Sequence, residues 1–308
     1  MCVWSQHLSM ENQASDFGRQ PEFLLNRPPL SQAPIGVFDS GVGGLTVLRE
    51  LYRQLPHESI LYFGDTARLP YGTKSRSEIL QYVREILTWM VQRRVKMVIM
   101  ACNTSSALAI ETVRSEFPNL PILGVILPGA RAAVQVGKRI GVISTPATAA
   151  SNAYRDAVLE IDPTAAVWQI GCPEFVPIVE ANRIDQPYTY QVAQEYLEPL
   201  LEQEIDTLIY GCTHYPHLAP VLKSLLPQSV QLIDPAVHVV KSASQELDLL
   251  GLKQVRSPRP TEFWVSGNPQ PFIEISRQWL GCTPLVEQIT LSSIIRQSIS
   301  IESESTSL

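Results

Sequence analysis

The chain has 308 residues, of which 45% are hydrophobic and 18% are charged, and its formal net charge is −6. This length and composition exclude an intrinsically disordered chain and fit two globular domains of ordinary size. The negative charge gives no reason to expect a nucleic acid or a membrane surface as a partner. No apolar stretch reaches the ~18 residues that a membrane span needs, and the first residues lack a secretory signal. We therefore expect a cytoplasmic protein.

Strands and helices are predicted to alternate along the first half of the chain. Residues 1–33 are polar and irregular and are predicted to be a disordered extension. After them, short apolar runs predict strands, and longer segments with helical spacing of apolar residues predict helices. The strands are expected at 34–38, 60–63, 95–100 and 121–127, and the helices at 45–55, 79–92 and 105–117. This alternation is typical of a parallel sheet with helices on both faces.

The second half of the chain repeats the first. Residues 139–145 resemble 34–40, residues 167–172 resemble 60–65, and residues 205–214 resemble 95–104. The offsets are 105, 107 and 110 residues, in the same order along the chain, which indicates a duplicated domain. Open parallel sheets bind ligands beyond the carboxyl ends of their strands. We therefore predict an α/β fold of two pseudo-symmetric open parallel-sheet domains, with the active site in the cleft between them.

Two of the five cysteines occupy the same place in each repeat. Cys102 and Cys212 each follow an apolar strand and have polar neighbours, so we expect them to face each other across a ligand. A helix is predicted to begin after Cys102, and the amino end of a helix can lower the pKa of a thiol. A buried structural cysteine is the alternative, and it suits Cys2, Cys172 and Cys282 better.

Polar residues near the two cysteines are candidates for assisting groups. Asp39 and Ser40 end the first strand, and the glycines after them let backbone N–H groups approach an anion. The alternative for Asp39 is a helix N-cap. His214 lies two residues after the second cysteine and can share a proton with it, although a lone histidine is more often structural. Tyr71 and Glu180 lie in matching loops of the two halves, with core packing and a solvated surface charge as their alternatives.

Neither a metal site nor a nucleotide cofactor is expected. A zinc site of Cys102, Cys212 and His214 would lack a second spaced pair of ligands. The glycine run at 41–44 has Thr46 where a dinucleotide fingerprint needs its third glycine, so a carboxylate-binding turn fits as well.

Four segments together resemble the signatures of the bacterial glutamate racemases, in the aspartate/glutamate racemase family: residues 35–44, 64–72, 101–104 and 211–216. The resemblance extends from about residue 35 to about residue 290. It implies two domains, one of residues 34–127 plus 240–290 and the other of residues 128–239, followed by a disordered tail at 291–308. Residues 261–267 would form the strand with which the chain returns to the first domain. A homodimer is also expected.

The resemblance further implies a racemase that interconverts L- and D-glutamate without a cofactor and supplies D-glutamate for peptidoglycan. Cys102 and Cys212 would be the catalytic thiols, with Asp39 and His214 as their acid/base partners. The substrate-binding residues that it implies are Asp39, Ser40, Tyr71, Gly72, Asn103, Thr104, Thr145, Thr148, Glu180, Thr213 and His214. The alternatives are an aspartate or related amino-acid racemase of the same superfamily and a non-catalytic, cleft-type ligand-binding protein.

Overall fold

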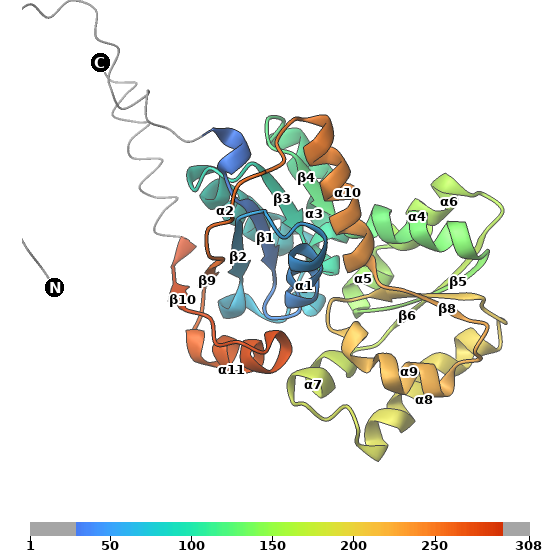
Figure 1. The fold of residues 1–308 in the computed structure, drawn as a ribbon. Helices are drawn as coiled ribbons and strands as arrows, with labels where there is room; N and C mark the ends of the chain where they lie inside the picture. Colours follow the sequence, from blue (N-terminus) through green and yellow to red (C-terminus); the bar gives the residue numbers. More distant parts are fainter. Residues whose placement is uncertain (1–28, 292–308) are drawn as a thin grey trace, which may run out of the picture.

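Two parallel β-sheets flanked by helices make up the part of the chain that the computed structural model describes, residues 29–291 (Figure 1). The predicted α/β fold class is therefore confirmed. Most of the extension predicted at 1–33 and of the tail predicted at 291–308 lies outside the described residues. Between residues 29 and 291, no helix combines the length and the apolar character needed to cross a bilayer.

The first lobe is built on a six-stranded sheet with the order β10-β9-β2-β1-β3-β4. Its strands are β1 (Ile35–Asp39), β2 (Ile60–Gly64), β3 (Met97–Met100), β4 (Ile122–Gly124), β9 (Glu262–Val265) and β10 (Val286–Gln288). Its helices are α1 (Leu45–Gln54), α2 (Arg76–Gln92), α3 (Asn103–Glu116) and α11 (Pro269–Leu280), and short 3₁₀ turns are η2 (Leu30–Gln32), η3 (Thr66–Arg68) and η4 (Tyr71–Thr73). The strand predicted at 261–267 is observed as β9, which pairs with β2.

The second lobe is built on a four-stranded sheet with the order β6-β5-β7-β8. Its strands are β5 (Arg139–Ser144), β6 (Ala166–Gly171), β7 (Thr207–Gly211) and β8 (Gln231–Ile233). Its helices are α4 (Ile126–Val136), α5 (Pro146–Ala150), α6 (Ala153–Ile161), α7 (Phe175–Glu180), α8 (Pro187–Leu201) and α9 (Ala219–Leu225), with the 3₁₀ helix η5 (Tyr215–Leu218). Helix α10 (Pro235–Leu249) packs against both α1 and α4 and so joins the lobes.

The two sheets share one topology. The strands β2-β1-β3-β4 of the first lobe and β6-β5-β7-β8 of the second lobe follow the same order. All strand pairs are parallel, as the repeated pattern predicts. The duplication places the loop after β3 and the loop after β7 at equivalent positions in the two lobes.

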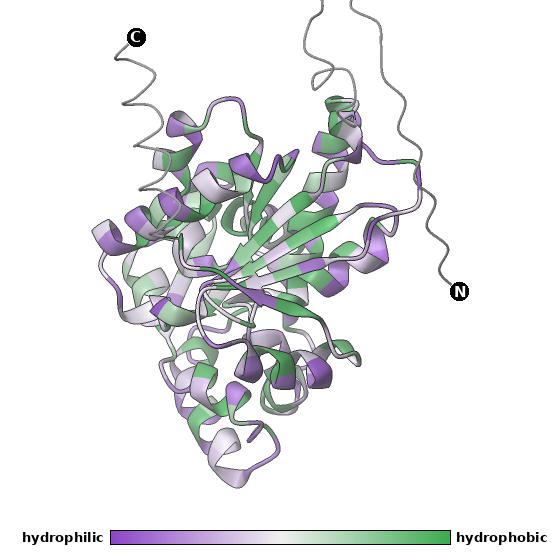
Figure 2. Cartoon of the chain, turned by 90° about the vertical axis from the view of Figure 1, so that its left-hand side faces the viewer, coloured by the Kyte–Doolittle hydropathy of each residue, from purple (hydrophilic) through white to green (hydrophobic). Residues whose placement is uncertain are grey.

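Apolar residues occupy the centre of the first lobe's sheet, as the hydropathy colouring shows (Figure 2). Every residue of β1, β2 and β7 is buried. Strands covered on both faces need such continuous apolar runs. Helix α2 begins where the sequence offers a capping box: the Ser75 side chain accepts from the backbone N–H of Glu78, and the Glu78 side chain accepts from that of Ser75.

The prediction for residues 121–127 was wrong in part. Only Ile122–Gly124 form a strand, and Ile126 already begins α4. An apolar run of this length can hold either structure, and periodicity does not separate them. Pro128 falls in the first turn of α4, where a missing N–H costs no helical hydrogen bond.

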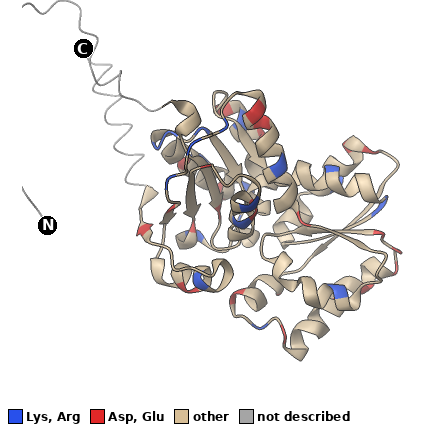
Figure 3. Cartoon of the chain, viewed as in Figure 1, with Lys and Arg blue, Asp and Glu red and all other residues tan. Residues whose placement is uncertain are grey.

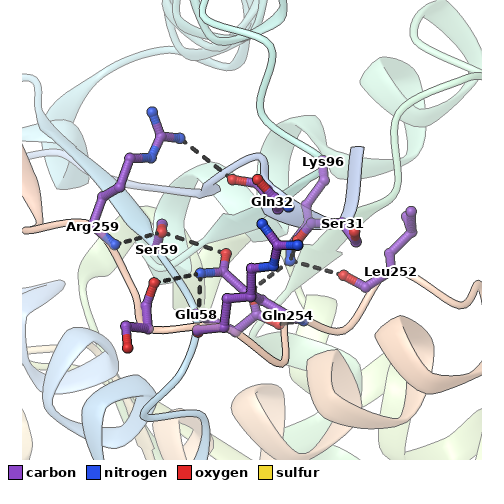
Figure 4. A network of polar contacts seen from close by, with 10 residues as sticks. Ser31, Gln32, Glu58, Ser59, Lys96, Leu252, Gln254 and Arg259 are labelled. Atoms are coloured by element: carbon purple, nitrogen blue, oxygen red, sulfur yellow. Dashed lines mark hydrogen bonds and ion pairs between the residues drawn. The ribbon is translucent and has the colours of Figure 1, made fainter. Parts of the chain in front are cut away.

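A buried ion pair lies where the chain enters β2 and β3, at the amino ends of the strands (Figure 4). Nζ of Lys96 donates to Oε2 of Glu58 and, at 2.8 Å each, to the carbonyl oxygens of Ser31 and Leu252. The backbone N–H of Gln254 donates to the other oxygen of Glu58 at 2.8 Å. This network ties the segment before β1 and the connection from α10 to β9 onto the sheet.

Candidate active site

A cavity of about 330 Å³ opens between the two lobes, at the carboxyl ends of their central strands. The residues that line it come from loops after β1, β2 and β3 in the first lobe and after β5, β6 and β7 in the second. Of the predicted site residues, it is lined by Ser40, Tyr71, Gly72, Cys102, Asn103, Thr104, Thr145, Glu180, Cys212, Thr213 and His214. Asp39 and Thr148 are fully buried and contact this wall from behind.

The two cysteines of the repeat meet at this cavity. Cys102 follows β3 and is the N-cap residue of α3, in an extended backbone conformation. Cys212 follows β7 at the equivalent point of the second lobe. Both are nearly buried, with 5% and 7% exposure. Both cysteines line the same cavity, and a negative charge on Cys212 would raise the pKa of Cys102 further.

The surroundings of Cys102 favour the protonated thiol. Burial is the main reason why the pKa of Cys102 rises to about 12, and the charge of Asp39 raises it further. The backbone N–H of Ser105 and the hydroxyl of Ser40 oppose this shift. A carboxylate next to this sulfur is therefore placed to attract its proton.

Asp39 is held rigidly by both lobes. Its Oδ1 accepts a hydrogen bond from the backbone N–H of Gly41 at 2.9 Å, and its Oδ2 accepts one from the hydroxyl of Thr213 at 3.3 Å. Burial raises the pKa of Asp39, while the charge of His214 and these hydrogen bonds lower it in part. A carboxyl group with a raised pKa is better suited to exchange a proton near neutral pH.

Cys212 begins a chain of three groups. Its Sγ lies 3.7 Å from Nδ1 of His214, and Nε2 of His214 lies 3.1 Å from Oε1 of Glu180. Burial lowers the pKa of His214, but the hydrogen bonds to Cys212 and Glu180 outweigh it and raise this pKa to about 10. A protonated imidazole can donate to both neighbours at once, because both of its nitrogens then carry hydrogen.

One glycine lets the lobes approach at this point. A Cβ atom on Gly43 would lie 2.1 Å from Oγ1 of Thr213 and 2.6 Å from Nδ1 and Cε1 of His214. The hydroxyl of Thr46 donates to the carbonyl oxygen of Thr213 across the same contact, at 3.3 Å. The bare glycine therefore allows the loop after β7 to pack on the amino end of α1.

Hydroxyl and amide groups form the polar wall on the α3 side. The hydroxyls of Thr104, Thr145 and Thr148 lie 3.0–3.2 Å from one another, which links α3 to α5. The hydroxyl of Tyr154 donates to Oδ1 of Asn103 at 2.7 Å. Because this oxygen is occupied, the amide NH₂ of Asn103 is the group left to face the cavity.

Tyr71 lines the cavity, but its hydroxyl is already engaged. It donates to Oδ2 of Asp65, a fully buried carboxylate that also accepts from Arg68 at 2.8 Å and from the hydroxyl of Ser266 at 2.7 Å. Tyr71 can therefore offer its ring and its backbone to a ligand, rather than its hydroxyl proton.

One wall of the cavity was not predicted from the sequence. Pro173, Val176 and Pro177, around the start of α7, give it an apolar surface, and Cys172 also lines it. The segment 172–180 leads directly to Glu180, which was the one signal that this loop faces the site. No lysine or arginine lines the cavity, so a bound carboxylate would depend on neutral donors and on His214.

A metal site is not evident in the part of the chain that the structure describes. Within residues 29–291, no group of three or more His, Cys, Asp or Glu side chains is arranged to hold an ion. Cys102, Cys212 and His214 thus share a cavity without forming a ligand cluster.

Comparison with known proteins shows to which family this chain belongs. The family model described as Asp/Glu/Hydantoin racemase matches residues 35–243. The chain belongs to the Asp/Glu/Hydantoin racemase family. Within this racemase family, it is 71% identical to a glutamate racemase of Microcystis aeruginosa over 86% of the chain and 93% of the relative. It is 68% identical to a glutamate racemase of a Nostoc species over 85% of the chain and 90% of the relative.

Solved structures of the racemase family have the same fold. A glutamate racemase isoform from Bacillus anthracis superposes with a TM-score of 0.81 at 39% identity, over 85% of this chain and 98% of that one. A glutamate racemase from Francisella tularensis in complex with D-glutamate gives a TM-score of 0.81 at 35% identity, over 85% and 99%. The predicted membership of this racemase family is confirmed.

Proposed function

We propose that this chain interconverts L- and D-glutamate without a cofactor, using Cys102 and Cys212 as two acid/base groups. The observation that carries the proposal is the presence of these two thiols in one cavity, at equivalent strand ends of two duplicated lobes. The glutamate racemases at 71% and 68% identity support glutamate as the substrate.

The proposed reaction inverts one carbon centre by two proton transfers. A thiolate on one side of the substrate takes the Cα proton, so the C–H bond breaks, an S–H bond forms, and the electron pair stays on the carbon. The thiol on the opposite side then gives its proton to that carbon, and its sulfur becomes the thiolate. The enzyme ends with its two protonation states exchanged, and the reverse reaction restores them.

Each thiol has its own assisting group in this proposal. Asp39 would accept the proton of Cys102, whose pKa is high because of burial and of this carboxylate. His214, held by Glu180, would exchange a proton with Cys212. The Cα proton of an amino acid is only weakly acidic, so its removal needs both a strong local base and stabilisation of the developing charge.

The substrate carboxylates would be held by neutral donors of both lobes. The proposed contacts are Ser40, Asn103, Thr104, Thr145, Thr213, and the backbone of Tyr71 and Gly72, with Thr148 acting through its hydrogen bonds to Thr104 and Thr145. Because such donors have fixed geometry, they can distinguish substrates by the distance between two carboxylates. The apolar wall from α7 would limit the space for larger side chains.

The first test is circular dichroism of the purified protein with L-glutamate or D-glutamate, and with aspartate in parallel. We expect both enantiomers of glutamate to lose their signal, and kcat/KM for aspartate to be much lower. Cys102→Ser and Cys212→Ser should each abolish racemisation yet still exchange the α-hydrogen of one enantiomer with deuterated solvent. Cys282→Ser, at an exposed thiol, is the control and should be fully active. Full activity of either active-site variant would overturn the two-thiol proposal.

The remaining expectations are part of the same proposal. D-Glutamate would serve peptidoglycan synthesis, and a reducing compartment such as the cytoplasm would keep Cys102, Cys172, Cys212 and Cys282 in their free form. Residues 34–127 with 240–290 and residues 128–239 would be the two domains, and the chain would form a homodimer. In the view of Figure 3, Lys and Arg are interspersed with Asp and Glu, and neither lobe shows a concentration of basic residues. This charge distribution supports a small molecule as the partner.

A further inference from the structure

Trp279 belongs to the hydrophobic packing of both lobes. It lies near the end of α11, a helix of the first lobe (Figure 1), and its ring contacts residues of the second lobe. Its half-buried side chain packs against the core of the first lobe and against the core formed around β7, α7 and α8 in the second. Among the partly buried hydrophobic residues of 29–291, it is the one that packs against both of these cores.

The indole of Trp279 contacts two histidines of the second lobe. Its centroid lies 3.9 Å from that of His217, with an angle of 31° between the ring planes. It lies 5.8 Å from that of His214, in an edge-to-face arrangement at 83°. Both contacts cross from the first lobe to the second, so a change in the relative position of the lobes would alter both.

The imidazole of His214 is thereby fixed on three sides. Cys212 faces one nitrogen, Glu180 faces the other, and the indole bounds the ring itself. Cys212 and Glu180 belong to the second lobe, and among these three contacts only Trp279 belongs to the first. The ring plane of His214 therefore depends on the closed arrangement of the lobes.

We propose that Trp279 is a positioning residue, which couples closure of the two lobes to the orientation of His214 and so to proton transfer at Cys212. The proposal rests on the proposed function. Cys102 receives its proton partner, Asp39, from its own lobe, whereas the indole of Trp279 lies beside His214, the partner of Cys212. Loss of the indole should therefore slow one of the two proton transfers and leave the other unchanged.

The test uses three variants of the full chain. Trp279→Leu keeps an apolar side chain but removes the stacked ring, and Trp279→Phe retains an aromatic ring. Leu280→Ala is the matched control, because Leu280 is also half-buried on α11 but packs only against the first lobe. Displacing a catalytic group by ~1 Å can cost ~100-fold in rate. We expect Trp279→Leu to lower kcat about tenfold or more in both directions, and Trp279→Phe to recover most of this loss.

Isotope effects identify which transfer is slowed. In Trp279→Leu, the α-deuterium isotope effect should rise for the enantiomer that Cys212 deprotonates, because that step becomes rate-limiting. For the other enantiomer the solvent isotope effect should rise instead, because Cys212 then delivers a solvent-derived proton. Cys102→Ser, which retains only Cys212, identifies the first enantiomer by its α-hydrogen exchange.

The outcomes separate this inference from the proposed function. The role of Trp279 would be overturned by isotope effects that change equally for the two enantiomers or in the opposite pattern. An unchanged kcat in Trp279→Leu, or the same isotope pattern in Leu280→Ala, would also overturn it. If Cys102→Ser exchanges both enantiomers or neither, the two-thiol mechanism itself fails.

Discussion

Replacing Glu180 with Gln removes the negative charge that faces Nε2 of His214 at 3.1 Å. Two unit charges 4 Å apart interact by ~1 kcal/mol in water and ~4 kcal/mol near a protein surface. The side chain of Glu180 is 32% exposed. A value between these limits, about 2 kcal/mol, corresponds to a pKa change of about 1.5 units. We therefore expect the pKa of His214 to fall clearly below its value of about 10 in the parent.

The same change alters stability in a defined pH range. A histidine whose pKa is higher in the folded state stabilises the fold fully below its unfolded value, near 6.5, and loses this contribution as the pH rises through about 10. The free energy of unfolding of Glu180→Gln should therefore be about 2 kcal/mol below that of the parent at pH 6. This gap should largely close by pH 10.

The assay combines an NMR titration of His214 with urea denaturation at both pH values. Glu198→Gln, at an exposed carboxylate on α8 of the same lobe, is the control and should change neither quantity. An unchanged His214 titration in Glu180→Gln would refute the reasoning. So would a stability difference that is as large at pH 10 as at pH 6.

Two further predictions concern other parts of the fold. Gly43→Ala would place a Cβ atom 2.1 Å from Oγ1 of Thr213, so racemase assays should show kcat falling about 100-fold. For Gly41→Ala, whose Cβ atom would come no closer than 3.2 Å to the end of the Leu69 side chain, kcat should fall much less, and equal losses would contradict the steric argument. Lys96→Met would leave the buried carboxylate of Glu58 without its cation, and urea denaturation should show a loss of about 3–5 kcal/mol. A loss below ~1 kcal/mol would show that this carboxylate is compensated in another way.

Much of the fold could be predicted because the sequence repeats. The apolar runs at 34–38, 60–63 and 95–100 contain the buried strands β1, β2 and β3, and their echoes at offsets of 105 to 110 residues fold in the same order. Helix ends were less predictable. Helix α3 begins at Asn103 rather than at the predicted Ser105. Cys102 is its N-cap residue, so the polar residues after it form the first turn.

The residues of the candidate site that directly follow a strand could be predicted from the sequence. Cys102 and Cys212 could be recognised because each lies in a polar loop that directly follows a buried strand. The contacts between loops were not predictable, because they depend on tertiary packing. Nothing local in the sequence indicates that the hydroxyl of Tyr71 binds Asp65, or that Trp279 lies against His217. The apolar wall from α7 was missed for the same reason.

The unlike surroundings of Cys102 and Cys212 have a kinetic consequence. One thiol lies beside Asp39 and the other beside His214, so in the proposed reaction the two enantiomers of the substrate would meet different proton acceptors. Mirror-image molecules have equal free energies in water, so the Haldane relationship requires the same kcat/KM in both directions. Any inequality between the thiols can therefore change kcat and KM for one enantiomer relative to the other only by the same factor. The concentrations of the two enantiomers alone determine the direction of the net reaction.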